Sequence, residues 1–260
     1  MNIEPKETGC NYCGSKLEKT LYFCPQCSTP YKDVQSLIPR VLPEYVDSEM
    51  LIRNNKEAWH VFFIVMAALV LGSIIGLFFT VNEESGAIYI VTSIALLASV
   101  IYLVARDWTT ISSQLKSVGF LKIHAWYGLV LLIPCLFINY GYHSMIESLY
   151  PAMETENYES IVTSQFGLIM VMCVSPAILE EIAFRGYIQS YFARDFSPWK
   201  AIAISSVLFS VMHFSFLSAP YLFLAGALMG WTRYKTGSLY PSIFIHFLHN
   251  LVVISFFNDL

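Results

Sequence analysis

The stretch IVTSQFGLIMVMCVSPAILEEI occupies residues 161–182, and its only charged side chains are Glu180 and Glu181 near its end. A helix of about 20 mostly apolar residues is long enough to cross the hydrocarbon core of a bilayer. Six other stretches have the same character and lie at residues 59–81, 87–105, 125–140, 201–217, 221–234 and 239–257. The sequence therefore predicts an all-α, polytopic transmembrane helix bundle of seven spans, with an eighth crossing left open. The stretches at 125–140, 201–217 and 221–234 are short, so we expect them to be tilted, re-entrant or buried in the bundle.

Composition supports a membrane protein with a small soluble head. Hydrophobic residues make up 56% of the chain and charged residues only 13%, whereas a soluble domain has about 25% charged residues. The net charge of −4 gives no sign of a nucleic-acid partner. The first fifty residues have no apolar segment after a basic start, so they do not resemble a signal peptide. We expect a head at residues 1–30, a linker at 31–58 and a membrane domain at 59–260.

The charges in the loops predict the orientation of the bundle. Cytoplasmic loops of membrane proteins are enriched in Lys and Arg. If the seven spans alternate, every basic group falls on one side, and the opposite loops carry Glu but no Lys or Arg: Glu83, Glu84, Glu147, Glu154, Glu156 and Glu159. We therefore expect a multi-pass protein of the cell membrane with a cytoplasmic N-terminus and an external C-terminus.

The head contains two Cys-x-x-Cys pairs, separated by ten residues: Cys10, Cys13, Cys24 and Cys27. Two such pairs form the tetrahedral thiolate site that structural zinc prefers. Two disulfides or a redox pair are the alternatives, but a reducing cytoplasmic location argues against disulfides. The pattern therefore predicts a zinc ribbon with one structural zinc. The head has few basic residues, which argues against nucleic-acid binding.

Three groups of polar residues lie within the apolar stretches of the C-terminal half. Ionisable side chains are costly inside a membrane and indicate functional sites. The groups are Glu180-Glu181-x-x-x-Arg185, Phe209-x-x-x-His213 and His246-x-x-x-Asn250. For the two glutamates the alternative is a solvated helix end at the interface. A single buried histidine is more often structural than catalytic, and we interpret His249, which belongs to no motif, in this way.

Helical geometry separates the roles of the two glutamates. At about 100° per residue, Glu181 and Arg185 lie about 40° apart and can form an ion pair. Glu180 lies about 140° from Arg185, so it points elsewhere, which suits a general base. Straight spans would place Glu180 near the inner edge of the membrane and His213 about 20 Å deep. We therefore expect either the fourth helix to continue past Arg185 or residues 196–200 to re-enter the bilayer.

The three groups, in this order on successive apolar helices, resemble the CAAX-protease and bacteriocin-processing family of intramembrane endopeptidases. The family pattern is Glu-Glu-x-x-x-Arg, Phe-x-x-x-His and His-x-x-x-Asn or Asp, and it is complete here. The resemblance covers residues 160–257 and implies hydrolysis of peptide bonds inside the membrane. It does not cover the cysteine head or the first three spans.

The resemblance also implies roles for the motif residues. Glu180 with His213 would activate a water, and His246 with Asn250 would stabilise the oxyanion. Glu181 and Arg185 would support the site, and Phe209 would pack beside it. A catalytic zinc held by a glutamate and two histidines is an alternative that remains open.

Two other classes of function remain. The first is a non-catalytic bacteriocin-immunity or regulatory protein that binds a peptide or partner in the same cavity. The second is a transporter or proton relay, but no inverted repeat supports it. The complete motif set favours the protease. The expected partners are the lipid bilayer and a peptide or membrane-protein substrate, and the family name alone suggests prenylated substrates.

Overall fold

The computed structural model describes residues 48–79, 87–116, 119–150 and 164–256, and the regular secondary structure in them is helical. The predicted all-α class is confirmed for these residues. The predicted zinc ribbon and its four cysteines lie outside them, as do Glu83, Glu84, Glu154, Glu156 and Glu159.

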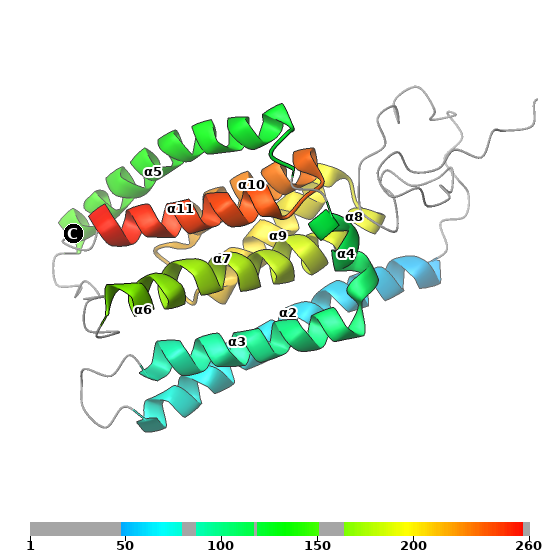
Figure 1. Cartoon of the computed structure of the whole chain (residues 1–260), viewed down its shortest axis with the longest axis horizontal. Helices are drawn as coiled ribbons and strands as arrows, with labels where there is room; N and C mark the ends of the chain where they lie inside the picture. The colour runs from blue at the N-terminus through cyan, green and yellow to red at the C-terminus, as the bar shows by residue number, and fades with distance from the viewer. Residues whose placement is uncertain (1–47, 80–86, 117–118, 151–163, 257–260) are drawn as a thin grey trace, which may run out of the picture.

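The helices follow the predicted apolar stretches (Figure 1). The first four are α2 (Ser48–Phe79), α3 (Ala87–Arg106), α4 (Trp108–Lys116) and α5 (Ile123–Leu149). A long helical stretch follows, which we call the central helix: α6 (Gln165–Ile169), the π-helical η2 (Met170–Val174), α7 (Ser175–Glu180), the π-helical η3 (Glu181–Ile188) and α8 (Gln189–Asp195). The last three are α9 (Pro198–Met212), α10 (Ala219–Thr236) and α11 (Tyr240–Phe256).

Four helices in the described ranges are long and apolar enough to cross a membrane, as expected for an integral membrane protein: Asn54–Phe78, Ala87–Arg106, Ile123–Leu149 and Gln165–Ala193. Two shorter apolar helices, α9 and α11, could not be assigned by length, so the count of seven spans stays a prediction. Two expected boundaries were wrong. Helix α2 begins at Ser48, inside the predicted linker, and α5 has 27 residues rather than being a short span.

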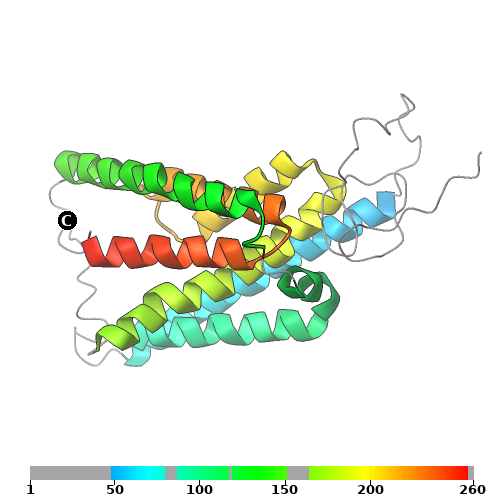
Figure 2. The ribbon, with the colours of Figure 1, turned by 45° about the horizontal axis from the view of Figure 1, so that its top comes forward.

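Helices α2 and α3 form a pair along one side of the bundle (Figures 1 and 2). Their contact depends on Gly72 and Gly76, which are spaced by four residues on α2. A Cβ atom at Gly76 would lie 2.6 Å from the Cα of Ile88, and one at Gly72 would lie 2.9 Å from the Cα of Thr92. Small residues at this spacing let two membrane helices approach closely, and close packing is the main attraction between them in lipid.

The central helix packs against α2, α3, α4, α9, α10 and α11, so it lies in the interior of the bundle. It continues past Arg185 as far as Asp195. Of the two expected alternatives, this is the continuation of the fourth helix rather than a re-entrant segment at residues 196–200. Glu180 is therefore fifteen residues from each end, at Gln165 and Asp195, or about 22 Å at 1.5 Å per residue. This extension places Glu180 deep in the bundle rather than at its edge.

Asp107 connects the turn between α3 and α4 to the central helix through hydrogen bonds. Its carboxylate accepts hydrogen bonds from the side chain of Thr109, from the backbone and side chain of Thr110, and from the hydroxyl of Tyr191 on α8. Burial alone would raise the pKa of Asp107, but these hydrogen bonds outweigh it and lower the pKa from 3.8 to about 2. The ionised form is thus the one that the fold stabilises.

We expect Asp107→Asn to destabilise the protein in a pH-dependent manner. Because the folded-state pKa is lower than the unfolded one, the wild-type advantage is complete above about pH 4 and is lost as the pH falls toward about 2. Thermal unfolding in detergent at pH 6 and pH 3 measures the difference in stability between wild type and Asp107→Asn. The gap in melting temperature between wild type and variant should narrow at pH 3, and a constant gap would contradict this role.

Candidate active site

Glu180 lies at the centre of the predicted site, on the last turn of α7. Its Oε2 atom is 4.0 Å from Nε2 of His213 and 3.9 Å from Nε2 of His246. Oε2 is buried and has no hydrogen-bond partner among the described residues. The structure therefore brings together one residue from each of the three motifs, from the central helix, α9 and α11.

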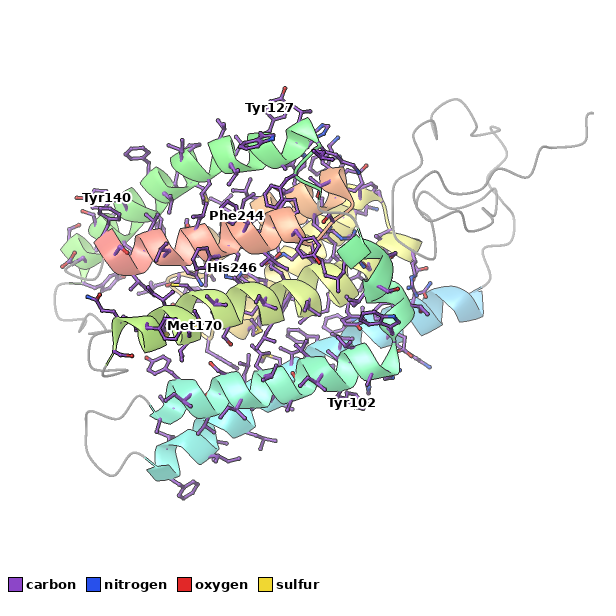
Figure 3. The ribbon with its side chains drawn as sticks, in the orientation of Figure 1. Tyr102, Tyr127, Tyr140, Met170, Phe244 and His246 are labelled. Atoms are coloured by element: carbon purple, nitrogen blue, oxygen red, sulfur yellow. The ribbon has the colours of Figure 1, made fainter. Side chains whose placement is uncertain are left out.

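Glu181 forms the predicted ion pair with Arg185. Glu181 Oε1 is 2.9 Å from Arg185 Nη1, and both side chains are fully buried. The same Oε1 atom accepts a hydrogen bond of 3.1 Å from Nδ1 of His246, whose side chain lies between α11 and α7 (Figure 3). Glu181 thus links the central helix to α11, a contact that its spacing from Arg185 did not predict.

Arg185 is held on two further sides. Its Nη2 donates a 3.0 Å hydrogen bond to the carbonyl of Gly226 on α10, and its guanidinium lies 4.3 Å from the ring centroid of Phe209. A Cβ atom at position 226 would lie 3.2 Å from Nη2, so glycine allows α10 to come this close. The Phe209 ring also lies 4.7 Å from the ring of His213 and is tilted by 60° to it, so Phe209 packs beside the site.

The two histidines beside Glu180 are oriented by acceptors on their other ring nitrogen. Nδ1 of His213 lies 2.8 Å from the carbonyl oxygen of Phe209, which can only accept. Nδ1 of His246 bonds to the Glu181 carboxylate. Because the hydrogen bond at one ring nitrogen sets the role of the other, both rings carry a proton on Nδ1 and present Nε2 to Glu180. The His213 side chain is 30% exposed and that of His246 only 4%, so the site opens at His213.

Asn250 does not contact the other site residues through any described interaction. Its Nδ2 donates a 3.0 Å hydrogen bond to the carbonyl of Met172 in η2, and its Oδ1 lies 2.9 Å from Nδ1 of His249. In α-helical register the Met172 carbonyl would bond to the backbone of Pro176, which has no N–H. Asn250 therefore supplies a donor to this carbonyl, and its role at an oxyanion stays a prediction.

Residues 162–252 match the family model described as Type II CAAX prenyl endopeptidase Rce1-like. The chain contains an Rce1-like domain. The matched segment lies inside the range 160–257 expected from the motifs and includes all of the residues of the three motifs. Comparisons with curated proteins and with solved structures gave no match.

The alternative catalytic zinc would need Glu180, His213 and His246 as its ligands. Among the described residues, no group of three or more His, Cys, Asp or Glu side chains is placed to hold a metal ion. Glu180, His213 and His246 do converge, but the glutamate oxygen is about 4 Å from both nitrogens. The geometry does not fit a metal centre, so we assign no step to one.

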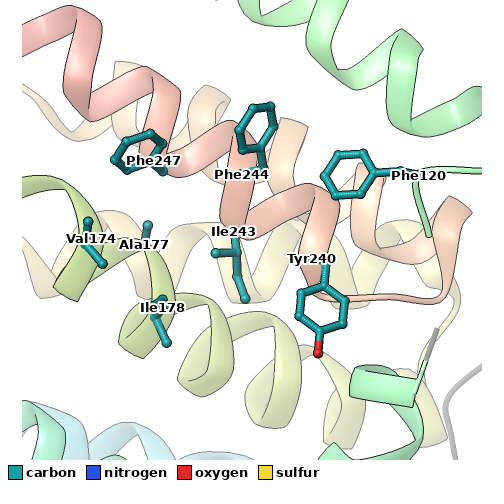
Figure 4. A pocket seen from close by; sticks show the side chains of 8 residues that line it. All are labelled: Phe120, Val174, Ala177, Ile178, Tyr240, Ile243, Phe244 and Phe247. Atoms are coloured by element: carbon teal, nitrogen blue, oxygen red, sulfur yellow. The ribbon is translucent and has the colours of Figure 1, made fainter. Parts of the chain in front are cut away.

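An apolar groove of about 270 Å³ lies between the central helix and α11 (Figure 4). One wall comes from the central helix and the other from α11, and Phe120 lies near the end of α11 that is predicted to be cytoplasmic. The lining residues are Phe120, Val174, Ala177, Ile178, Tyr240, Ile243, Phe244 and Phe247. Ala177 precedes Glu180 by three residues, and Ile243 precedes His246 by three. The groove is thus bounded by the two helices that carry the site.

Sequence reasoning missed the buried polar contacts of Arg233, whereas its interpretation of His249 as structural agrees with the hydrogen bonds of that residue. Arg233 is buried and donates to Gln114 Oε1 at 3.2 Å and to Ser190 Oγ at 2.7 Å. His249, interpreted as structural, is hydrogen-bonded to Tyr221 and Asn250. The spacing Gly226-x-x-x-Gly230 was a usable signal, because each glycine carbonyl accepts from a buried polar side chain of the central helix, Arg185 or Gln189.

Proposed function

We propose that the chain is an intramembrane endopeptidase that uses Glu180 as the base for an attacking water. The observation that carries this proposal is the position of Glu180 Oε2, buried, without a hydrogen-bond partner among the described residues, and facing two histidine nitrogens. The separations of about 4 Å exceed a direct hydrogen bond and suit a bridging water. The match of residues 162–252 to a prenyl endopeptidase family supports peptide hydrolysis.

The proposed reaction has two steps. In the first, Glu180 accepts a proton from the water while the water oxygen attacks the carbonyl carbon of the peptide bond. The carbonyl oxygen then becomes an oxyanion. When His246 or His213 is protonated on both ring nitrogens, its Nε2–H can donate a hydrogen bond to this oxyanion, a stabilisation worth several kcal/mol at oxyanion sites. Glu180 then passes its proton to the departing amine as the C–N bond breaks, leaving a carboxylate and a new N-terminus.

The apolar groove indicates the substrate class. Its lining offers a place for apolar groups about one helical turn from Glu180 and from His246 along their helices, and no charged side chain contributes to it. We therefore propose a membrane-associated substrate that places an apolar segment between the central helix and α11. A peptide precursor and a membrane-protein segment both have this chemistry, as does a prenylated chain end.

Filling the groove should weaken substrate binding without affecting the fold. Ile178 lines the groove and is 40% exposed, so Ile178→Trp adds bulk at its open side. We expect KM to rise by about 10-fold, the cost of a poorly fitting apolar pocket, with little change in kcat. Met170→Trp is the matched control, because Met170 lies on the same helix, is 38% exposed and does not line the groove. Equal effects of the two substitutions would contradict the proposed binding role.

The activity itself is tested by comparing peptides released from membranes that contain wild type or Glu180→Ala at equal levels. New peptide termini should appear only with the wild type, and their sequences would identify the substrate. Identical sets of termini in the two samples would instead favour the alternative function, a non-catalytic immunity or regulatory protein that binds a peptide or partner.

Three features of the full chain belong to the same proposal. The head binds one structural zinc through its four cysteines, which elemental analysis of the purified chain measures. The bundle crosses the membrane seven times, with the N-terminus in the cytoplasm. Labelling with an impermeant reagent should then reach a cysteine placed at Thr155 in intact cells and should not reach one placed at Ser117.

A further inference from the structure

A chain of hydrogen bonds, in which Asn250 is the one residue of the three motifs, connects four helices. The thiol of Cys135 on α5 lies 3.8 Å from the hydroxyl of Tyr221 on α10, which bonds to Nε2 of His249. The rings of Tyr221 and His249 are stacked, with centroids 5.6 Å apart. His249 continues the chain to Asn250 on α11, and Asn250 continues it to the Met172 carbonyl in the central helix.

The direction of each hydrogen bond can be worked out from the end at Met172. A carbonyl only accepts, so the amide nitrogen of Asn250 faces Met172 and its amide oxygen faces His249. Nδ1 of His249 must then donate, which leaves Nε2 of the neutral ring as an acceptor for the Tyr221 hydroxyl. The Tyr221 oxygen in turn accepts from the Cys135 thiol. Every donor in this chain has an acceptor, so a flip of the Asn250 amide would disrupt it at two places.

The chain of hydrogen bonds determines the register of α11 against the central helix. Asn250 is one turn after His246 on α11, and its bond to Met172 lies two turns before Glu180. A sliding of α11 along the central helix would therefore change the separation of His246 and Glu180 as well as breaking the bond at Met172. Tyr221 and His249 hold the Asn250 amide in the one orientation that allows this bond.

We propose that Tyr221 and His249 are positioning residues for the active site. Tyr221 sets the tautomer of His249, His249 sets the orientation of the Asn250 amide, and the Asn250–Met172 bond keeps His246 at its place beside Glu180. The effect on catalysis rests on the proposed endopeptidase function, whereas the tautomer of His249 does not.

The experiment compares wild type with Tyr221→Phe, which removes only the hydroxyl. Misplacing a reacting group by about 1 Å can cost 100-fold, so kcat should fall by about 10- to 100-fold with KM within about 2-fold. The matched control is Tyr142→Phe, because the Tyr142 hydroxyl donates to the Leu217 carbonyl and not to His249. A second variant, His249→Phe, keeps an aromatic ring against Tyr221 but removes both hydrogen bonds, and should show the same loss of kcat.

Nitrogen NMR of histidine-labelled protein supplies a readout that does not require a substrate. In the wild type, the His249 resonances, assigned by their loss in His249→Phe, should show a neutral ring protonated at Nδ1. Tyr221→Phe should change this pattern, and Tyr142→Phe should not. A wild-type ring protonated at Nε2, or normal kcat in Tyr221→Phe and His249→Phe, would overturn the inference. If wild type and Glu180→Gln are equally inactive, the proteolytic function fails, and the NMR result alone decides the tautomer.

Discussion

Replacing Glu180 with Gln is expected to abolish peptide cleavage while the protein remains folded. A positioned general base contributes about 10²- to 10⁴-fold to a rate, and Gln cannot accept the proton of the attacking water. The fold should tolerate the change because Oε2 of Glu180 makes no hydrogen bond with the described residues. Removing an unpaired buried charge also removes its desolvation cost.

Specific activity and thermal unfolding of purified wild type and Glu180→Gln measure this outcome. Glu57→Gln is the matched control, because Glu57 pairs with Arg106 at a partly exposed place on α2, away from the site. The control should retain full activity. Near-normal cleavage by Glu180→Gln would show that another group is the base, and Glu181 would then be the first candidate.

Replacing Glu181 with Gln is expected to destabilise the protein strongly. Its carboxylate is fully buried and is shared between Arg185 at 2.9 Å and His246 at 3.1 Å. Removing one partner of a buried ion pair leaves the other charge uncompensated, which typically costs about 3–5 kcal/mol. The bond from Arg185 to the Gly226 carbonyl and the contact with Phe209 remain, so we expect a loss near the lower end, about 3 kcal/mol.

A double variant separates the structural role of Glu181 from its effect on His246. In Glu181→Leu with Arg185→Met, both charges are absent, and well-packed apolar replacements of a buried pair are often neutral in stability. The free energy of unfolding of the double variant should therefore return toward the wild-type value. Activity should not return, because Nδ1 of His246 then has no acceptor at position 181. For Glu181→Gln alone, whose side-chain oxygen can still accept from His246, activity should follow the amount of folded protein. A stable but inactive Glu181→Gln protein would exchange the roles of the two glutamates.

Several features of the site could be predicted because they depend on neighbours within one helix. The Glu181–Arg185 ion pair and the Phe209–His213 ring contact each join residues four positions apart, and such pairs face each other on any helix. The depth of Glu180 could not be predicted in this way. Hydropathy indicated where the fourth span begins but not that the helix would continue through a buried polar segment to Asp195.

The π-helical segments explain why some contacts between helices could not be predicted from residue spacing. Rotation at 100° per residue assumes an α-helix, but η3 begins at Glu181 and bonds residues five positions apart. Glu181 pairs with Arg185 and Glu180 faces His213, yet both glutamates also lie close to His246. The bond from Asn250 to Met172 was similarly hidden, although Pro176 indicated that a carbonyl one turn before it would need another donor.

The sequence by itself determined that this chain is helical, rich in membrane-spanning segments and equipped with three polar motifs, because apolar run length and residue spacing are local properties. Only the tertiary structure decided which motif residues meet. Glu180 gains its two histidines from α9 and α11, and Asn250 and His249 join a second network through α10. Contacts between helices depend on their relative register and rotation, which are set by glycine contacts, π-helical turns and buried hydrogen bonds contributed by distant parts of the chain.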